Sequence, residues 1–413
     1  MQKRKKHTGL IIVLSILAVL IITVVGAAGT YSRFGGFGTG DCADTEEFSK
    51  YATSVSELTV PDEAQIVALG EATHGNKEFQ QLRLDVFQVL VEKYGVRAFA
   101  LEGDFGGCEA INRYIHGADG TAAEALSATG FAIYRTEEME SLVEWMRGYN
   151  ASATQSDDLR FYGFDMEQRA YTYRYLLEAV HKANIEAAEF EKMRNSETGT
   201  YADGYTTEQR TEIISAVKEQ LPPDDVQAIH FADILLQNIE LGKYIDDSGE
   251  LNAQRDRMMA ENTLWILQQE QARGNSRILI SGHNNHIMQC ENAGTPVLGS
   301  LLAENLGDGY FAIGTDFYKS VCNLPKPYTG KRITHTFYSY DPLAKASKKC
   351  GFDVSFLDFS KVPEGSLLTE HLANSISMGS LGESYSVLMN FVPRSYRVQR
   401  IPQDAYDAMI FVA

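Results

Sequence analysis

Short apolar runs alternate with longer amphipathic stretches from about residue 60 to the end of the chain. The apolar runs are bounded by glycine or charge and predict buried strands at 65–69, 98–101, 161–164, 278–280, 310–313 and 354–357. The stretches between them predict helices at 78–94, 109–116, 138–149, 173–183, 208–220, 224–244, 252–273 and 342–349. Strands separated by helices favour an α/β fold, with a largely parallel or mixed central sheet flanked by helices.

Two regions depart from this alternation. The segment from about 184 to 275 is polar and helical without a convincing strand, which predicts a helical insertion or cap packed beside the sheet. Near the C-terminus, YSVLMNFV (385–392) and AMIFVA (408–413) predict two more strands near one sheet edge. We therefore expect one α/β domain over 56–413 that carries this insertion.

Residues 1–29 have the pattern of a membrane segment. Lys3, Arg4, Lys5 and Lys6 precede an apolar run, which small residues extend to about twenty positions. A helix of that length can cross a bilayer, and the basic cluster keeps its own side in the cytoplasm. We expect an uncleaved single-pass anchor, in the membrane through residues 8–29, with an extracellular domain. A cleaved signal peptide and a secreted protein are the alternative. The glycine-rich residues 30–41 begin a linker that runs to residue 55.

Composition and motif content argue against several classes of function. The chain has 413 residues, with 37 Lys and Arg against 55 Asp and Glu, for a formal net charge of −18. An acidic protein repels phosphate backbones, so nucleic acid is not an expected partner. The five cysteines form no CxxC pair, which argues against a zinc ribbon or a thioredoxin-like site. The sequence also lacks GxSxG, HExxH and phosphate-loop motifs.

Polar clusters follow three of the predicted strands. They are GEATHG (70–75), EGD (102–104) and SGHNNH (281–286). The carboxyl ends of parallel strands meet at one edge of a sheet, so these clusters are expected to lie together. A neutral imidazole can take a proton from water, and a nearby carboxylate orients it and stabilises the imidazolium. Arg83, on the helix after the first cluster, offers a fixed charge for a carboxylate or an oxyanion.

Five motifs occur in an order that resembles the erythromycin esterase family. They are GEATHGNKEF (70–79) followed by Arg83, ALEGDFGGCEAINRYIHG (100–117), YGFDM (162–166), RDRMMAENTLWIL (255–267) and ISGHNNHIM (280–288). The resemblance implies an α/β fold with a helical appendage and a cleft between them. It also implies hydrolysis of the macrolactone ester of erythromycin-type antibiotics, by histidine-activated water and without a covalent intermediate.

The resemblance also implies roles for individual residues. His74 matches the general base and Glu71 the acidic residue of the first motif, while Arg83, Glu102 and His283 match other active-site positions. The residues expected to contact the substrate are His286, Arg255, Asp104 and Asp165. No metal or other cofactor is expected, and the substrate would be a small-molecule ester or lactone. A role in antibiotic resistance would follow from a macrolide substrate. Two departures stand out: characterised resistance enzymes of the family are cytoplasmic, and 184–250, where substrate preference would be set, carries no recognisable motif.

Two other readings of the same residues stay open. The first is a metal-dependent hydrolase of cell-envelope glycan or phosphate esters, because Glu71, His74 and the HNNH run offer nitrogen and oxygen donors for a metal. A non-enzymatic surface module that binds ligands in a polar cleft is the other. Arg83 argues against a metal, because it would place a fixed positive charge beside a divalent cation.

Overall fold

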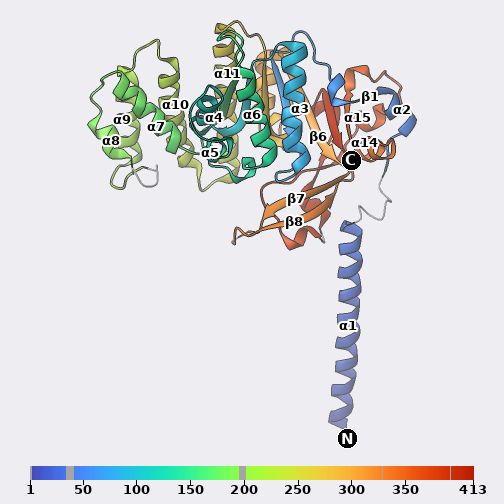
Figure 1. The fold of residues 1–413 in the computed structure, drawn as a ribbon. Helices are drawn as coiled ribbons and strands as arrows, with labels where there is room; N and C mark the ends of the chain where they lie inside the picture. Colours follow the sequence, from blue (N-terminus) through green and yellow to red (C-terminus); the bar gives the residue numbers. More distant parts are fainter. Residues whose placement is uncertain (1, 34–40, 195–200, 328, 391) are drawn as a thin grey trace.

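A mixed β-sheet forms the centre of the protein. The computed structural model describes residues 2–33, 41–194, 201–327, 329–390 and 392–413. Within these ranges the large sheet has the strand order β1 (Ala52–Thr53), β9 (Val354–Asp358), β12 (Ala408–Val412), β6 (Tyr310–Phe317), β2 (Ile66–Glu71), β5 (Ile278–His283), β3 (Ala98–Asp104) and β4 (Arg160–Asp165). The strands from β12 to β4 run parallel, and β9 and β1 add antiparallel pairings. The predicted α/β class is confirmed (Figure 1).

Alternation along the strands creates a hydrophobic core on each face of the sheet. In β2, Val67 and Leu69 belong to one core, whereas Ile66 and Ala68 belong to the other. The first core includes α3 (Lys77–Tyr94) and α6 (Glu137–Asn150), and the second includes α11 (Ser248–Ala272) and α13 (Leu298–Leu306). Because both faces are covered, the strands are apolar throughout instead of alternating with polar residues.

The remaining elements surround this core. The helices are α1 (Gln2–Arg33), α2 (Thr45–Tyr51), α4 (Phe105–Ile115), α5 (Ala122–Ser127), α7 (Ala170–Lys182), α8 (Ala188–Met193), α9 (Thr207–Gln220), α10 (Val226–Leu241), α12 (Asn284–Ile287), α14 (Pro342–Lys349), α15 (Thr369–Ala373) and α16 (Pro402–Ala405). The other strands are β7 (Lys319–Pro325), β8 (Arg332–Tyr338), β10 (Ile376–Gly379) and β11 (Arg397–Arg400). The 3₁₀ helices include η2 (Ala132–Tyr134) and η6 (Val387–Asn390).

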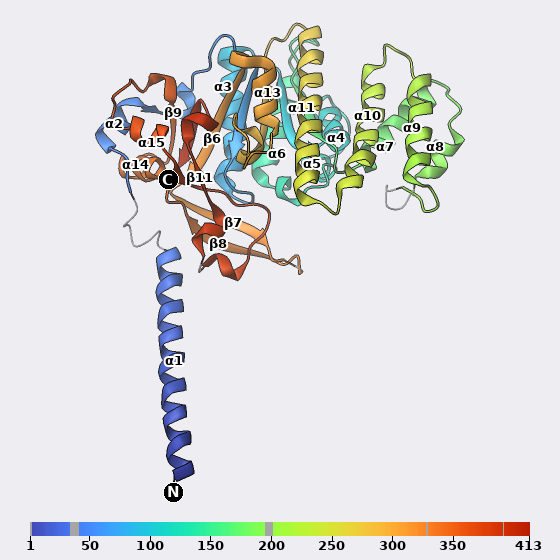
Figure 2. The same ribbon diagram turned by 180° about the vertical axis from the view of Figure 1, so that it is seen from behind.

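The helical segment after β4 divides into two parts. Helices α8, α9 and α10 gather with α7 at the end of the molecule far from β1, as Figure 2 also shows from behind. Helix α11 instead packs against β4 and α13 and connects β4 to β5. The region expected as one insertion over 184–275 therefore contains a covering helix of the sheet as well as a helical appendage.

Two expectations about the C-terminal region were wrong. In the described part of 385–392, the chain forms η6 and irregular structure instead of a strand. The AMIFVA segment does form a strand, β12, but β9 and β1 pair beyond it, so it lies inside the sheet. Two small antiparallel pairs, β7 with β8 and β10 with β11, lie outside the main sheet and were not expected. Strand β7 alternates exposed and buried residues, which is the pattern of a one-sided hairpin.

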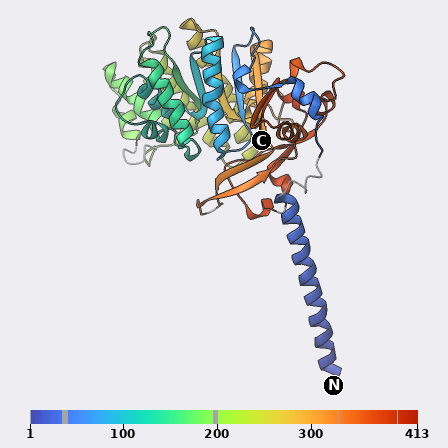
Figure 3. The ribbon, with the colours of Figure 1, turned by 45° about the vertical axis from the view of Figure 1, so that its right-hand side comes forward.

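The N-terminal region contains an exposed apolar helix. Within α1, Ile12–Gly29 is long and apolar enough to cross a membrane, and none of that window is buried. The part of the linker at 34–40 lies outside the described residues. Residues 45–53, expected as linker, form α2 and β1, and Phe48 is fully buried against the body. Figure 3 shows α1 on the side of the body where the orange β7–β8 hairpin projects.

Candidate active site

A tight turn after β2 places His74 at the carboxyl end of the sheet. Gly75 has a φ of +74°, and a Cβ there would lie 2.4 Å from the Asn323 carbonyl oxygen, so the turn requires glycine. Asn76 then caps α3, its side-chain oxygen accepting from the Phe79 N–H at 2.8 Å. The turn and the cap together fix the direction in which the His74 ring leaves the backbone.

Glu71 and His74 form a buried imidazole–carboxylate pair. Nδ1 of His74 lies 2.9 Å from Oε2 of Glu71, and Oε1 of the same carboxylate accepts from Gln80 Nε2 at 3.0 Å. Burial lowers the pKa of His74, but the Glu71 charge outweighs it and raises that pKa above its usual value. With Nδ1 occupied by Glu71, Nε2 is the nitrogen left for a water molecule or a substrate.

Arg83 supports Glu71 and does not face the cavity. Its Nη2 donates to Glu71 Oε2 at 3.0 Å, its Nε donates to Ser281 Oγ at 3.0 Å, and its Nη1 donates to Gln80. Burial raises the pKa of Glu71, yet Arg83 and His74 outweigh it and hold that pKa below its usual value. Of the two partners expected for Arg83, a carboxylate or an oxyanion, the structure shows the carboxylate: this arginine orients Glu71 and lowers its pKa.

A second acid–base cluster lies across the neighbouring strand ends. Nδ1 of His286 lies 2.7 Å from Asp256 Oδ1, and Nε2 lies 3.5 Å from Glu102 Oε1. Arg255 Nη2 donates to Glu102 at 3.2 Å and to Asp165 at 2.5 Å. Burial lowers the pKa of His286, but Glu102 and Asp256 outweigh it and raise that pKa. His286 is thus stabilised in its protonated form.

The charge of Glu102 is fixed by the same cluster. Its carboxylate accepts the backbone N–H of His283 at 2.7 Å in addition to Arg255. Burial alone would raise the pKa of Glu102, but His286 and Arg255 overcome this and hold it well below its usual range. Glu102 is therefore an anion. It links the two clusters, because its charge also raises the pKa of His74.

His283 differs from the other two histidines because the backbone occupies both of its ring nitrogens. Its Nδ1 accepts from the Asn285 N–H at 3.2 Å, so Nε2 carries the proton and donates to the Leu381 carbonyl at 3.2 Å. Burial and the nearby His74 lower its pKa to about 3. The expected catalytic role of His283 is therefore revised: the ring is neutral and links β5 to the 380–383 segment.

Asp104 and Asp165, expected to bind substrate, lie beneath the cavity. Asp104 caps α4, its Oδ2 accepting from the Gly107 N–H at 2.7 Å, and burial raises its pKa to about 8. Asp165 is fully buried and bound to Arg255. The structure assigns both residues to the support of the site instead of to direct contact.

The polar groups meet at a cavity of about 370 Å³. It is lined by His74, Glu102, Phe131, Ile133, Tyr134, Glu167, Asn252, Arg255, Asp256, His283, Asn285, His286, Asn292, Val297, Ser380, Gly382 and Glu383. Five expected site residues are in this lining, and Glu71, Arg83, Asp104 and Asp165 are not. The walls come from η2, the start of α11 and the 380–383 segment, and no described residue of 184–250 contributes. The cleft is therefore formed against α11, not against the helical appendage.

Sequence reasoning missed several residues of the site. Asp256 orients His286, Gln80 bonds Glu71, and the Tyr134 hydroxyl donates to the Glu102 carbonyl at 2.6 Å. Asp256 directly follows Arg255 in the quoted motif, and Gln80 directly follows the first motif. Their closeness to these motifs was the one feature of the sequence that could have indicated them. Tyr134 and the 380–383 segment carried no signal, because only tertiary contacts bring them to the strand ends.

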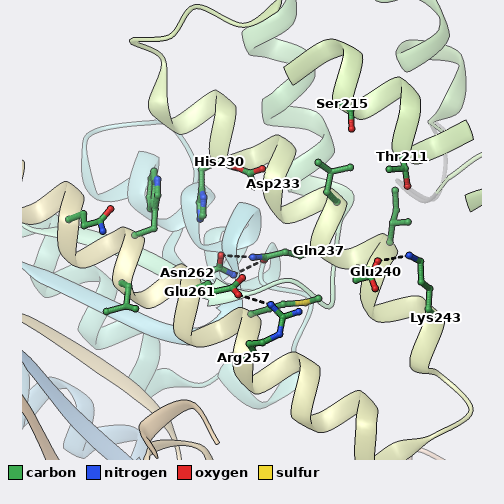
Figure 4. A pocket seen from close by; sticks show the side chains of 16 residues that line it. Thr211, Ser215, His230, Asp233, Gln237, Glu240, Lys243, Arg257, Glu261 and Asn262 are labelled. Atoms are coloured by element: carbon green, nitrogen blue, oxygen red, sulfur yellow. Dashed lines mark hydrogen bonds and ion pairs between the residues drawn. The ribbon is translucent and has the colours of Figure 1, made fainter. Parts of the chain in front are cut away.

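A larger hollow of about 750 Å³ lies between α9, α10 and α11 (Figure 4). His230 stacks on Trp265 there with ring centroids 4.0 Å apart, and burial lowers its pKa to about 3. The other charges lining it are in ion pairs, Lys243 with Glu240, Arg257 with Glu261 and Asp233 with Lys218. A neutral histidine without a carboxylate partner does not provide acid–base chemistry, so the smaller cavity is the candidate active site.

The donor groups of the site do not converge on one point. Among the residues that the structure describes, no group of three or more His, Cys, Asp or Glu side chains is arranged to hold a metal ion. Arg83 and Arg255 lie within hydrogen-bonding distance of the carboxylates that would have to be ligands. Glu71 is thus paired with Arg83, and Glu102 with Arg255.

The fold and the site together define an α/β protein with a histidine–carboxylate centre of hydrolytic type. The sequence profile of the erythromycin esterase family matches residues 91–413, so the chain belongs to this family, a family of hydrolases. An erythromycin esterase type II from Escherichia coli is 26% identical over 357 residues, which cover 73% of this chain and 82% of that protein.

Solved structures share the fold. A succinoglycan biosynthesis protein superimposes with a TM-score of 0.72 at 19% identity, covering 89% of this chain and 95% of its own. A mutant of the erythromycin esterase EreC in its open conformation superimposes with a TM-score of 0.56 at 16% identity, covering 85% and 91%. At these identities the likeness shows the architecture alone.

The pH dependence of the reaction is expected to report the Glu71–His74 pair. Glu71 raises the pKa of His74, and a general base works only after it has lost its proton, so kcat/KM should rise with pH through that raised value. Glu71→Gln removes the charge, and we expect the acidic limb to move to lower pH while the plateau falls. Glu78→Gln, an exposed change of equal charge on α3, should leave the profile unchanged. An acidic limb that stays in place in Glu71→Gln would contradict this pairing.

Proposed function

We propose that this protein is a hydrolase of carboxylic esters or lactones in which His74 activates water directly. The observation that carries the proposal is the His74 ring, oriented through Nδ1 by Glu71 at 2.9 Å, on the wall of the cavity. Glu71 is in turn held ionised by Arg83. The lining has no serine or cysteine hydrogen-bonded to His74, so the arrangement favours attack by water over a covalent intermediate.

The chemical steps follow from the positions of these groups. Nε2 of His74 takes a proton as the water oxygen bonds to the carbonyl carbon, and Glu71 stabilises the resulting imidazolium. The carbonyl oxygen becomes an oxyanion, and the cavity wall offers it the Arg255 guanidinium and His286, whose raised pKa favours the cationic form. The intermediate then expels the alkoxide, which receives the proton held by His74 Nε2, and the neutral base is restored. The products are a carboxylic acid and an alcohol, joined in one chain when the substrate is a lactone.

The substrate that we favour is a macrolide-type macrolactone. This proposal rests on family membership and on the activity named for the Escherichia coli relative. Hydrolysis of such an antibiotic would open its ring, and the protein would then contribute to resistance. The cavity lining combines Phe131, Ile133 and Val297 with the polar groups, which suits a large ester with apolar faces.

The test is a product screen with the purified full-length protein. We expect mass spectrometry to detect the gain of one water on macrolides or on other lactones, and we expect the activity to persist after chelation of divalent ions. Loss of activity in chelator, restored by one specific divalent ion, would instead support the metal-dependent alternative. Absence of hydrolysis on all esters and lactones, with ligand binding retained, would support a binding module.

We further propose that α1 anchors the protein in the membrane and that residues 41–413 lie outside the cell. The support is the exposed apolar window Ile12–Gly29 together with the basic residues that precede it. A mature protein that begins near residue 28 or 30 in the medium would show secretion instead.

A further inference from the structure

The β7–β8 hairpin has one face directed to the body and one directed to solvent. Ser320, Cys322 and Leu324 are buried, whereas the alternate positions Lys319 and Val321 are exposed. The buried face packs on the His74 turn: Asn76 Nδ2 donates to Ser320 Oγ at 2.7 Å, and the Asn323 N–H donates to the Gly75 carbonyl at 2.9 Å. The hairpin is thus attached to the edge of the sheet that carries His74, and its outer face is exposed apart from the contacts of β8 with α1.

The outer face is basic in an otherwise acidic protein. Residues 319–338 contain Lys319, Lys326, Lys331 and Arg332 and no acidic residue, although the whole chain has 55 acidic against 37 basic side chains. Glu383 lies 3.9 Å from Arg332.

Exposed valines accompany the basic side chains of this face. Val321 on β7 is 46% exposed. The 385–392 segment joins the end of β7 through the Tyr385 N–H, which donates to the Pro325 carbonyl at 2.9 Å, and it exposes Val387 and Val392 by 59% and 40%. Cations mixed with exposed apolar side chains are typical of surfaces that lie on lipid headgroups.

The hairpin lies on the side of the body where α1 ends. Helix α1 contacts β8 and η6, and Figures 1 and 3 show the hairpin beside the upper end of α1. Asp41 is fixed to the body through His371 Nε2 at 2.9 Å, and the chain from Arg33 to Asp41 spans at most about 28 Å when fully extended. A membrane that contains α1 is therefore close to this face.

The cavity opens at the same edge. The C-terminus follows β12, which runs parallel to β6 and β2, and it lies at the lower border of the body in Figures 1 and 2, on the side of α1. Strands β5 and β3 run parallel to β2, and the carboxyl ends of these three strands carry His283, Glu102 and Glu71. A surface that contacts the hairpin is therefore next to the mouth of the site.

We propose that the outer face of the β7–β8 hairpin docks on anionic lipid headgroups of the membrane that α1 spans. The basic side chains attract the negative surface, and the exposed valines contact the interfacial layer. Docking orients the tethered domain with its cavity beside the lipid surface. The inference rests on the proposed anchor and is independent of the proposed esterase activity.

The test uses the full-length protein reconstituted into vesicles, with lysine acetylation read out by mass spectrometry. One preparation contains phosphatidylcholine alone, and the other contains about one third phosphatidylglycerol. We expect Lys319, Lys326 and Lys331 to react about fivefold more slowly in the anionic vesicles, and this protection to vanish at about 0.5 M salt. Lys93 and Lys361 serve as internal references, because both are exposed at the opposite edge, Lys93 in the last turn of α3 and Lys361 just after β9.

Matched variants separate docking from general charge effects. Lys326→Glu with Lys331→Glu should abolish the protection of Lys319, whereas Lys93→Glu with Lys361→Glu, an equal change in net charge, should leave it intact. Equal labelling of the hairpin lysines in the two vesicles would overturn the docking proposal. Hydrolysis of a soluble ester by the same samples reports the proposed function separately, and N-terminal sequencing of protein from intact cells reports the anchor.

Discussion

His74→Ala is expected to lower kcat by about 10²–10⁴ while the protein remains folded, which is the usual size of a general-base contribution. The imidazole hydrogen-bonds to Glu71, lies on the cavity wall and is not part of the hydrophobic core, so its removal should not disturb packing. Steady-state kinetics on an aryl ester or a lactone, combined with circular dichroism, would measure both effects.

The control for this prediction is another histidine paired with a glutamate. His181 lies 2.8 Å from Glu191 on the exposed helical appendage, and its side chain is 59% exposed. His181→Ala should retain full activity. A folded His74→Ala protein with wild-type kcat would eliminate His74 as the base.

Arg83→Met is expected to reduce the free energy of unfolding by about 3–5 kcal/mol, because the buried Glu71 carboxylate would lose its countercharge. Both side chains are almost inaccessible, at 1% and 2% exposure, so solvent cannot replace the guanidinium. Activity should fall as well, since Glu71 would lose the charge that keeps it ionised and oriented. Urea unfolding followed by fluorescence would measure the change in stability.

Two further variants make this prediction specific to the buried pair. Arg257→Met breaks an exposed pair with Glu261 and should change stability by less than about 1 kcal/mol. Arg83→Met combined with Glu71→Gln removes both charges and should recover most of the stability without recovering activity. Full activity in Arg83→Met would mean that Glu71 does not act through this arginine.

The sequence by itself determined the fold class and the place of the site. Apolar runs between helices can be buried only in a sheet covered on both faces, and parallel strands bring their carboxyl ends to one edge. The pairing of Glu71 with His74 was also predictable, because the two residues are three positions apart on one turn. The membrane-length apolar run at residues 10–29 was equally evident, since length and composition are local properties.

Only the tertiary structure decided which side chains line the cavity and which lie behind it. Arg83 donates hydrogen bonds to Ser281 and Gln80, and His283 donates one to the Leu381 carbonyl. Asp104 accepts one from the first turn of α4. Asp256 reaches His286 because α11 crosses back over the sheet. Most of these partners are distant in sequence, and a buried polar group takes its role from the partner that satisfies it. Residue type and spacing can therefore indicate a site, while hydrogen bonds between distant segments set the charge and direction of each group in it.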